Sequence, residues 1–499
     1  MKSQNTFFLL ITVLLAALYC FALYAFRISG IAFVVATMAF IVALPLSFRH
    51  PTVLLGLIIA SIGLCPFFLR ARVMPGLPMI YADDAFVLFG IVYMFLAYGP
   101  FGRKKIRLGS MTIFILFVLF VISAFVPFVT EPAAKTAFRN FTETFLFGFV
   151  LYIIFYNEVD ENNINTLMRW VAVTTLILAA IVCIEVIIQN NPLTRMAQKI
   201  MEDFIYLSPE NYKFLDSYYR PYAIFFHPSE AGTFLAMGLP FVFYSVRNNR
   251  PCIKYAAMAL AIVGVILNYT RGVWVALAFA LLVCNVKHLK RILPAALAIL
   301  VLLLGLSYLT MGDTPFFRRI FDPTNFYNRL YYWKVGLNMF MTYFPFGIGH
   351  MNFKDRYLEF VDTVAAPSGL DVKQIFVADN IFLTTLVEHG FLGFLTQMVL
   401  FGAAIWLTAR LGASFRKRGD SDNALRLNTL LQAMVVYLLA GCFADVQLFA
   451  KVTKFFFITT GMALAIAKFA GNERPVLRGG APASPAELGE PLRPDKEWP

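Results

Sequence analysis

Charged residues are scarce in this chain. They make up 14% of its 499 residues, whereas a typical soluble domain has roughly 25%. Hydrophobic residues reach 60%, and the mean hydropathy is +0.71. This composition excludes an ordinary soluble enzyme and predicts an all-α integral membrane protein that crosses the bilayer many times.

Closely spaced metal ligands and disulfide patterns are also missing. The six cysteines are scattered, mostly within apolar stretches, and we interpret them as small core residues. The predicted outer face has no Asp-x-Asp pair, carboxylate cage or histidine cluster. Its one adjacent acidic pair, Asp83-Asp84, is interpreted as a helix cap, with metal binding as the alternative. The sequence therefore predicts no metal and no cofactor.

Apolar runs of about 17–25 residues follow one another along the chain and predict about 12–14 transmembrane helices. The first run, after Lys2, has no evident cleavage site and is interpreted as a retained helix. The runs lie at residues 7–26, 30–48, 51–69, 83–98, 110–129, 141–157, 167–188, 229–246, 254–269, 272–286, 291–309, 380–408, 426–446 and 450–469.

The net charge of +13 gathers in short turns between these runs, which excludes a nucleic-acid partner. By the positive-inside rule such turns are cytoplasmic. The outer face then receives the segment 189–222, the turn 269–272, the loop 310–378 and the helix entry at Asp379. The basic turns contain Arg49, Arg103, Lys104, Lys105, Arg107, Arg247, Arg250, Lys254, Lys287, Lys290, Arg291, Arg410, Arg416, Lys417 and Arg418.

The loop 310–378 is the longest polar interruption of the apolar pattern. Loops beyond about 12–15 residues are uncommon and usually functional or disordered. This loop is rich in aromatic residues interleaved with Arg318, Arg319 and Arg329, which predicts amphipathic helices at the headgroup level. We expect N-terminal helices in 1–220, a core in 221–410, C-terminal helices in 411–470 and a disordered cytoplasmic tail in 471–499.

Five arginines fall on the predicted outer face, which the positive-inside rule should deplete. Arginine binds phosphate well because its planar fork offers several donors and keeps its charge. Helix-end anchoring by long side chains is the alternative. The set predicts a site for an anionic ligand, and it comprises Arg220, Arg271, Arg318, Arg319 and Arg329.

Several short motifs resemble, in order, those of the O-antigen ligase and Wzy-type polymerase superfamily. The resemblance covers about residues 215–410 and implies an inverting, metal-independent glycosyltransferase of the GT-C kind. Such an enzyme takes a glycan from undecaprenyl diphosphate at the outer face of the bacterial inner membrane and passes it to a sugar hydroxyl. The motifs are Arg220 before Phe225-Phe226-His227-Pro228-Ser229, Thr270-Arg271-Gly272-Val273-Trp274, Arg329-Leu330-Tyr331-Tyr332-Trp333, Phe344-Pro345-Phe346-Gly347-Ile348-Gly349, and Asp379-Asn380 before Gly390 and Gly393.

One position departs from the family pattern. Ligases typically have a histidine before the asparagine, and here that position is Asp379. The resemblance implies that Asp379 acts on the acceptor and that the protein is closer to exopolysaccharide polymerases. A helix cap is the alternative role for Asp379, reinforced by Asn380.

Other residues are candidates around the same reaction. His350 and His227 are rival catalytic bases. Asn380 and His227 are expected along the acceptor path. Glu388 and His389 are expected there too, because an ionisable pair about two turns into a span is costly unless it faces a wet cavity. For this part of the span, the alternative is helix packing through Gly390 and Gly393.

Other function classes remain open. One is an O-antigen ligase that acts on a lipid core. A lipid-linked-sugar flippase would need coupling carboxylates near the bilayer midplane, but Glu143 and Glu185 fall toward span ends and no internal repeat is evident. A noncatalytic scaffold would leave the arginines unexplained. Expected partners are the undecaprenyl-diphosphate-linked glycan, the lipid bilayer and other polysaccharide-assembly proteins.

This topology predicts a labelling pattern. Single cysteines at Ser368 and Asn211, in a cysteine-free background, should react with an impermeant maleimide in intact spheroplasts, because both positions lie outside. A cysteine at Asp420 should react only after permeabilisation. Labelling of position 420 but not 368 in intact cells would invert the topology.

Overall fold

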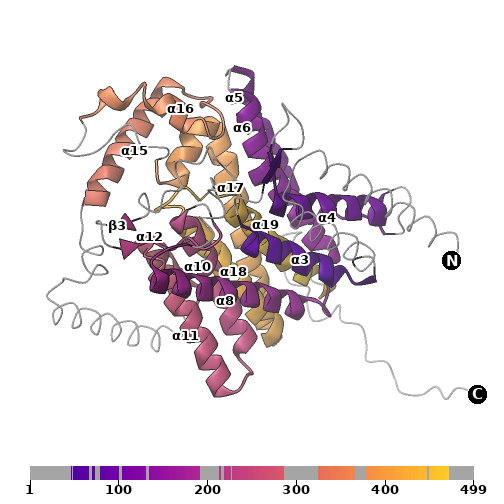
Figure 1. Ribbon diagram of the computed structural model, residues 1–499. Coiled ribbons are helices and arrows are strands. Elements are labelled where there is room, and N and C mark those ends of the chain that lie inside the picture. The colour runs from indigo at the N-terminus through magenta and orange to yellow at the C-terminus, as the bar shows by residue number, and fades with distance from the viewer. Residues whose placement is uncertain are drawn as a thin grey trace, which may run out of the picture.

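The computed structural model describes residues 47, 49–66, 70–72, 79–99, 104–130, 134–191, 213–214, 218–225, 227–285, 324–365, 378–446 and 449–470. These residues are overwhelmingly helical, which confirms an all-α membrane protein. In Figure 1, α15 and α16 gather at one end of the helical bundle, and α11 points toward the other end. Two short hairpins pair β1 with β2 and β3 with β4.

The helices of the described part follow the predicted apolar runs closely. The runs 7–26, 30–48 (except residue 47) and 291–309 lie outside the described residues. The helices are α3 (Pro51–Leu64), α4 (Ala82–Tyr98), α5 (Met111–Thr130), α6 (Ala134–Phe141), a π-helical turn (Thr142–Leu146), α7 (Phe147–Glu158), α8 (Ile164–Ile188), α10 (Pro228–Val246), α11 (Pro251–Leu267), α12 (Arg271–Cys284), α15 (Thr324–Thr342), α16 (Phe353–Tyr357), α17 (Ile381–Lys417), α18 (Ser421–Ala440) and α19 (Ala450–Phe469); the strands are β1 (Arg70–Arg72), β2 (Met79–Tyr81), β3 (Lys213–Phe214) and β4 (Tyr218–Tyr219).

Four helical stretches of the described part are long and apolar enough to cross a membrane, namely Phe138–Glu158, Ile164–Ile188, Ile381–Lys417 and Ala450–Phe469. Helix α17 continues past the predicted end at residue 408. Its last turn carries Arg416 and Lys417, which favour the negative end of the helix dipole. Polar residues thus continue α17 beyond its apolar run, and hydropathy alone does not predict where such a helix ends.

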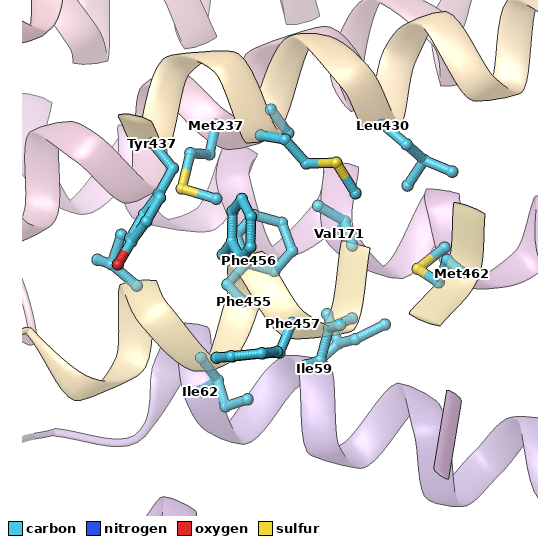
Figure 2. Packing of buried hydrophobic residues seen from close by; sticks show 14 of the residues in the cluster. Ile59, Ile62, Val171, Met237, Leu430, Tyr437, Phe455, Phe456, Phe457 and Met462 are labelled. Atoms are coloured by element: carbon cyan, nitrogen blue, oxygen red, sulfur yellow. The ribbon is translucent and has the colours of Figure 1, made fainter. Parts of the chain in front are cut away.

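Helix α19 forms the centre of the bundle, and its residues 451–467 are buried. Three consecutive phenylalanines point to three different neighbours, since helical residues project about 100° apart. Phe455 stacks on Phe234 of α10 at 4.9 Å between ring centroids, and Phe456 lies 4.8 Å from Phe401 of α17. Phe457 meets a ring of α5 edge-on. Figure 2 shows these rings in the core.

A buried ion cluster joins α19 to α4. Lys454 Nζ lies 2.8 Å from Asp83 Oδ2 and also contacts Asp84 Oδ1, and all three side chains are almost fully buried. Both carboxylates lie in the first turn of α4, as predicted for the start of this span, and they also pair with a lysine far away in sequence, which was not predicted. Removing one member of a buried pair typically costs about 3–5 kcal/mol, so this contact constrains how the two helices pack.

The chain segment that precedes α16 docks at a break in α17. Gly390 has φ 68° and ψ −175°, which interrupts the helix. The carbonyls of Val387 and Glu388 accept hydrogen bonds from Ile348 N at 3.0 Å and Gly349 N at 2.8 Å. Phe391 N donates to the carbonyl of residue 345 at 2.9 Å. The loop segment 345–349 thus pairs with the backbone groups at the break.

A second, smaller core holds the described part of the predicted external loop against the first half of α17. Buried members are Tyr331 and Met339 of α15 and Val387 of α17. Trp333 Nε1 also donates to the carbonyl of Ala378 at 2.9 Å. The described part of the loop is therefore packed against α17, with α15 fixed beside the entry of that helix.

This docking predicts that Gly390→Ala destabilises the protein. A Cβ at Gly390 would strike the carbonyl oxygen of Pro345, and the left-handed φ disfavours alanine. We expect a loss of about 1–3 kcal/mol, which is typical of a strained backbone position. Thermal unfolding of the purified protein in detergent measures it.

The matched control is Gly402→Ala in the same helix, where an added Cβ meets nothing within 4 Å. This control should keep the melting temperature or raise it slightly, because alanine favours helix. Equal melting temperatures for both variants would contradict the role assigned to the break.

Candidate functional site

Asp379 lies immediately before α17 and faces an arginine of the loop. Its carboxylate Oδ2 is 3.6 Å from Arg329 Nε of α15. Its backbone has φ 52°, a left-handed conformation that aspartate tolerates better than most residues. The side chain is 38% exposed, so it stays accessible from outside the protein.

The cap of α17 is Asn380. Its Oδ1 accepts hydrogen bonds from Phe382 N at 3.0 Å and Leu383 N at 3.2 Å. The alternative reading of Asp379 as the cap is therefore wrong. Asn380, which was expected along the acceptor path, satisfies backbone donors of the helix. The carboxylate of Asp379 remains directed at Arg329.

The electrostatic surroundings of Asp379 are mixed. Partial burial raises the pKa of its carboxyl group, and the positive charges of Arg329 and Arg220 oppose that rise. Arg220 is thus close enough to act on Asp379 although it is far away in sequence. An elevated pKa makes a carboxylate a better proton acceptor. The structure brings a candidate base together with two of the predicted phosphate-binding arginines.

The segment after Arg220 is held by a carboxylate from α8. Glu185 Oε2 accepts hydrogen bonds from Tyr222 N at 3.1 Å and Ala223 N at 3.2 Å. Asn191 Nδ2 donates to the carbonyl of Ala223 at 2.6 Å, and Ala223 has φ 51°. Glu185 therefore fixes a strained turn beside Arg220, which gives this carboxylate a structural role.

Arg271 begins α12 and belongs to the same region through its neighbours. In the turn before it, Asn268 Nδ2 donates to the carbonyl of Pro221 at 2.9 Å. Gly272 packs so closely on Phe443 that a Cβ could not be accommodated.

The turn containing Phe443 also holds the entry of α17. Ile381 N donates to the carbonyl of Gly441 at 2.8 Å, and Asn380 Nδ2 donates to that of Cys442 at 3.4 Å. Arg329 thus contacts Asp379 directly, and residues next to Arg220 and Arg271 belong to a chain of contacts that reaches the entry of α17. Arg318 and Arg319 lie outside the described residues.

His227 has a structural position. Its Nδ1 accepts a hydrogen bond from Ser229 N at 3.1 Å and so caps α10. Its ring stacks on Phe449 with 5.7 Å between centroids. Burial lowers its pKa to about 3, and the charge of Arg220 adds to this effect. The imidazole is thus neutral, with one nitrogen already occupied.

His350 does not lie at Asp379 but in a buried cluster at the break of α17. Its Nδ1 is 3.3 Å from Glu388 Oε2 and 3.1 Å from His389 Nε2. Glu388, predicted along the acceptor path, is 0% exposed, as is His350. Burial lowers the pKa of His350 to about 3. Neither side chain reaches solvent in this conformation.

The sequence pattern pairs Glu388 with His389 along the acceptor path and shows no histidine cluster on the predicted outer face, so it does not bring His350 to that pair. One feature of the sequence could have indicated that the two histidines meet. Gly349-His350 and His389-Gly390 each place a histidine beside a glycine, where the backbone can depart from a regular helix.

Comparison with protein families agrees with these motifs. A family model described as O-antigen ligase matches residues 256–398. The match spans Arg271, Arg329, the docking segment 345–349, Asp379 and the break at Gly390. No curated protein matches the chain. Residues 256–398 are thus similar to the O-antigen ligase family, which confirms the predicted resemblance to the O-antigen ligase and Wzy-type polymerase superfamily.

Proposed function

We propose that this membrane enzyme transfers a glycan from undecaprenyl diphosphate to an acceptor sugar hydroxyl at the periplasmic face of the bacterial inner membrane, as a polymerase of exopolysaccharide or O-antigen. The observation that carries the proposal is the placement of Asp379 beside Arg329 and Arg220 at the helix entry where the family has its histidine.

The arginines suit the departing diphosphate. Several guanidinium groups in one region can neutralise the charge that develops on the leaving group as the glycosidic bond to phosphate breaks. Guanidinium donors match phosphate oxygens in pairs and keep their charge at all physiological pH values. In this proposal Arg220 and Arg271 hold the diphosphate, and Arg329 links that charge to Asp379.

Asp379 would act on the acceptor. The acceptor oxygen attacks the anomeric carbon of the donor sugar from the face opposite the diphosphate, and Asp379 takes the hydroxyl proton. The bond between the anomeric carbon and the diphosphate oxygen breaks, and undecaprenyl diphosphate leaves with the electron pair. One displacement of this kind inverts the anomeric configuration, and the arginines supply the positive charge that the step requires.

Reconstitution tests the function directly. The purified protein in proteoliposomes receives an undecaprenyl-diphosphate-linked repeat unit, with or without a lipid A core acceptor. A polymerase gives a ladder of longer lipid-linked glycans in both samples. A ligase instead modifies the lipid core, and a flippase moves the glycan across the bilayer without lengthening it. Either of the last two results would overturn the polymerase proposal.

The first prediction from this site concerns Arg220 and Arg271. Replacing either by alanine removes a charge-assisted contact worth roughly 1.5–3 kcal/mol, so glycan transfer should fall at least about tenfold by that measure. Lysine should restore only part of the rate, because a point charge does not reproduce the bidentate fork. Quantified glycan products in proteoliposomes give the readout.

Arg250→Ala is the matched control, because Arg250 is an exposed arginine on the predicted cytoplasmic side, before α11. This variant should transfer glycan at the unchanged rate. Full activity in both Arg220→Ala and Arg271→Ala would mean that these arginines only anchor helix ends.

The second prediction concerns Asp379→Asn. Asparagine tolerates a left-handed backbone, and Asn380 remains the cap of α17, so expression and melting temperature should stay nearly unchanged. Transfer should fall by about 10²–10⁴, the usual contribution of general-base catalysis. Asp379→His should restore part of the activity if the family's histidine acts in the same way.

A pH profile distinguishes a base from a binding residue. The wild-type rate should rise with pH through the elevated pKa of Asp379, because only the carboxylate accepts a proton. The residual rate of Asp379→Asn should lack this rise. Wild-type transfer by the asparagine variant would rule Asp379 out as the base.

A further inference from the structure

The buried cluster at the break of α17 contains the donor set of a metal site. Two imidazoles and one carboxylate, from His350, Glu388 and His389, place one ligand atom each within 4.8 Å of one another. We propose that these three side chains bind a divalent cation of the zinc class, and that the cation fastens the docking segment 345–349 to α17. The proposal does not rest on the glycosyltransferase function.

The spacing of the ligand atoms fits a small tetrahedral ion. Zinc bonds to nitrogen and oxygen of about 2.0–2.1 Å in tetrahedral geometry place neighbouring ligand atoms about 3.3 Å apart. His350 Nδ1 lies 3.1 Å from His389 Nε2 and 3.3 Å from Glu388 Oε2. Two edges of the ligand triangle thus have the expected length.

The protonation of His389 also fits a bound cation. His389 Nδ1 is 3.2 Å from Gln397 Oε1, which can only accept, so Nδ1 carries the proton and Nε2 presents its lone pair to the cluster. A hydrogen bond from the distal nitrogen of this kind is what orients metal-bound histidines. Gln397 thus selects the tautomer of His389 that can coordinate a cation.

Glu388 leaves one oxygen for the cation. Its Oε1 accepts a hydrogen bond from Phe353 N at 3.4 Å, whereas its Oε2 makes no hydrogen bond of regular geometry in the described part of the chain and lies 3.3 Å from His350 Nδ1. A proton on His350 Nδ1 can be donated to only one of the other two ligand atoms. A buried acceptor without a partner is costly, and a single cation coordinated by all three atoms removes that cost.

The surroundings exclude water and hold the ligands in place. The ring of Phe145 lies 5.5 Å from that of His350 and 5.9 Å from that of His389. Phe120 of α5 and Phe141 of α6 complete an aromatic shell around the cluster. The ligands therefore come from the loop and from α17, and two further helices cover them, so a bound ion would join the loop to the bundle.

The site is separate from the proposed reaction centre. Glu388 follows Asp379 by nine positions, which is about 13 Å along a helix at 1.5 Å per residue. Two imidazoles with a carboxylate favour Zn²⁺ and its neighbours over Mg²⁺ or Ca²⁺, which prefer oxygen ligands. We therefore assign a structural role to the ion.

Metal analysis of the full-length protein in detergent tests the proposal. Protein purified without chelator or affinity metal should contain zinc near equimolar with the chain, by mass spectrometry of the metal. Protein from cells grown with Co²⁺ should show the visible absorption of four-coordinate Co²⁺ with imidazole ligands. A chelator should lower the melting temperature of the wild type.

Variants locate the ion. Glu388→Gln and His389→Gln keep the side-chain size, and each should lose most of the metal, the cobalt spectrum and the response to chelator. His50→Gln, at an exposed histidine before α3, should keep all three. Wild-type protein that is metal-free as isolated and takes up neither Zn²⁺ nor Co²⁺ would overturn the proposal, as would metal retained in both cluster variants.

Discussion

The break of α17 at Gly390 is the constraint on which the rest of the site depends. An uninterrupted helix would satisfy its own carbonyls, but here those of Val387 and Glu388 are released and taken up by the loop backbone. In an apolar environment each unsatisfied backbone group costs several kcal/mol, so the broken helix and the loop each need the other. Gly347 permits this approach, because a Cβ there would lie 2.7 Å from the carbonyl oxygen of Glu388.

The docking determines where the loop arginine lies. The second core fixes α15 on the first half of α17. The indole of Trp333 donates a hydrogen bond to the carbonyl of Ala378, the residue directly before Asp379. Arg329 is on the same helix as Trp333 and therefore meets Asp379.

Backbone strain gathers in the same region, since Ala223, Tyr269 and Asp379 all have positive φ. Such residues cost about 1–3 kcal/mol each and persist where the surroundings hold them. Here Glu185 accepts a hydrogen bond from Ala223 N, and residues next to the other two, Asn268 and Asn380, donate to the carbonyls of Pro221 and Cys442.

The sequence predicted much of this arrangement, and the reason differs from element to element. Apolar length predicted the helices, because the bilayer demands a fixed span. Charge placement predicted five arginines as one anion-binding set, of which Arg220, Arg271 and Arg329 are described and Arg318 and Arg319 are not. Hydropathy could not show which residues pair across the chain, such as Lys454 with Asp83, or Asn380 with the turn after α18. The cap assignment for Asp379 failed for a local reason, since Asp and Asn are equally good caps and only the backbone decides between adjacent positions.

The two carboxylates at either end of the first half of α17 have opposite environments. Asp379 is partly exposed between arginines, whereas Glu388 is enclosed with His350 and His389 among aromatic rings. The helix between them is short and rigid, so a shift at the break must also move the entry of α17 relative to α15. Fixing the loop at Glu388 therefore fixes the distance between Arg329 and Asp379. The proposed reaction needs Arg329 and Asp379 aligned to within about 0.5 Å, and packing at Glu388, nine positions further along the chain, would supply that alignment.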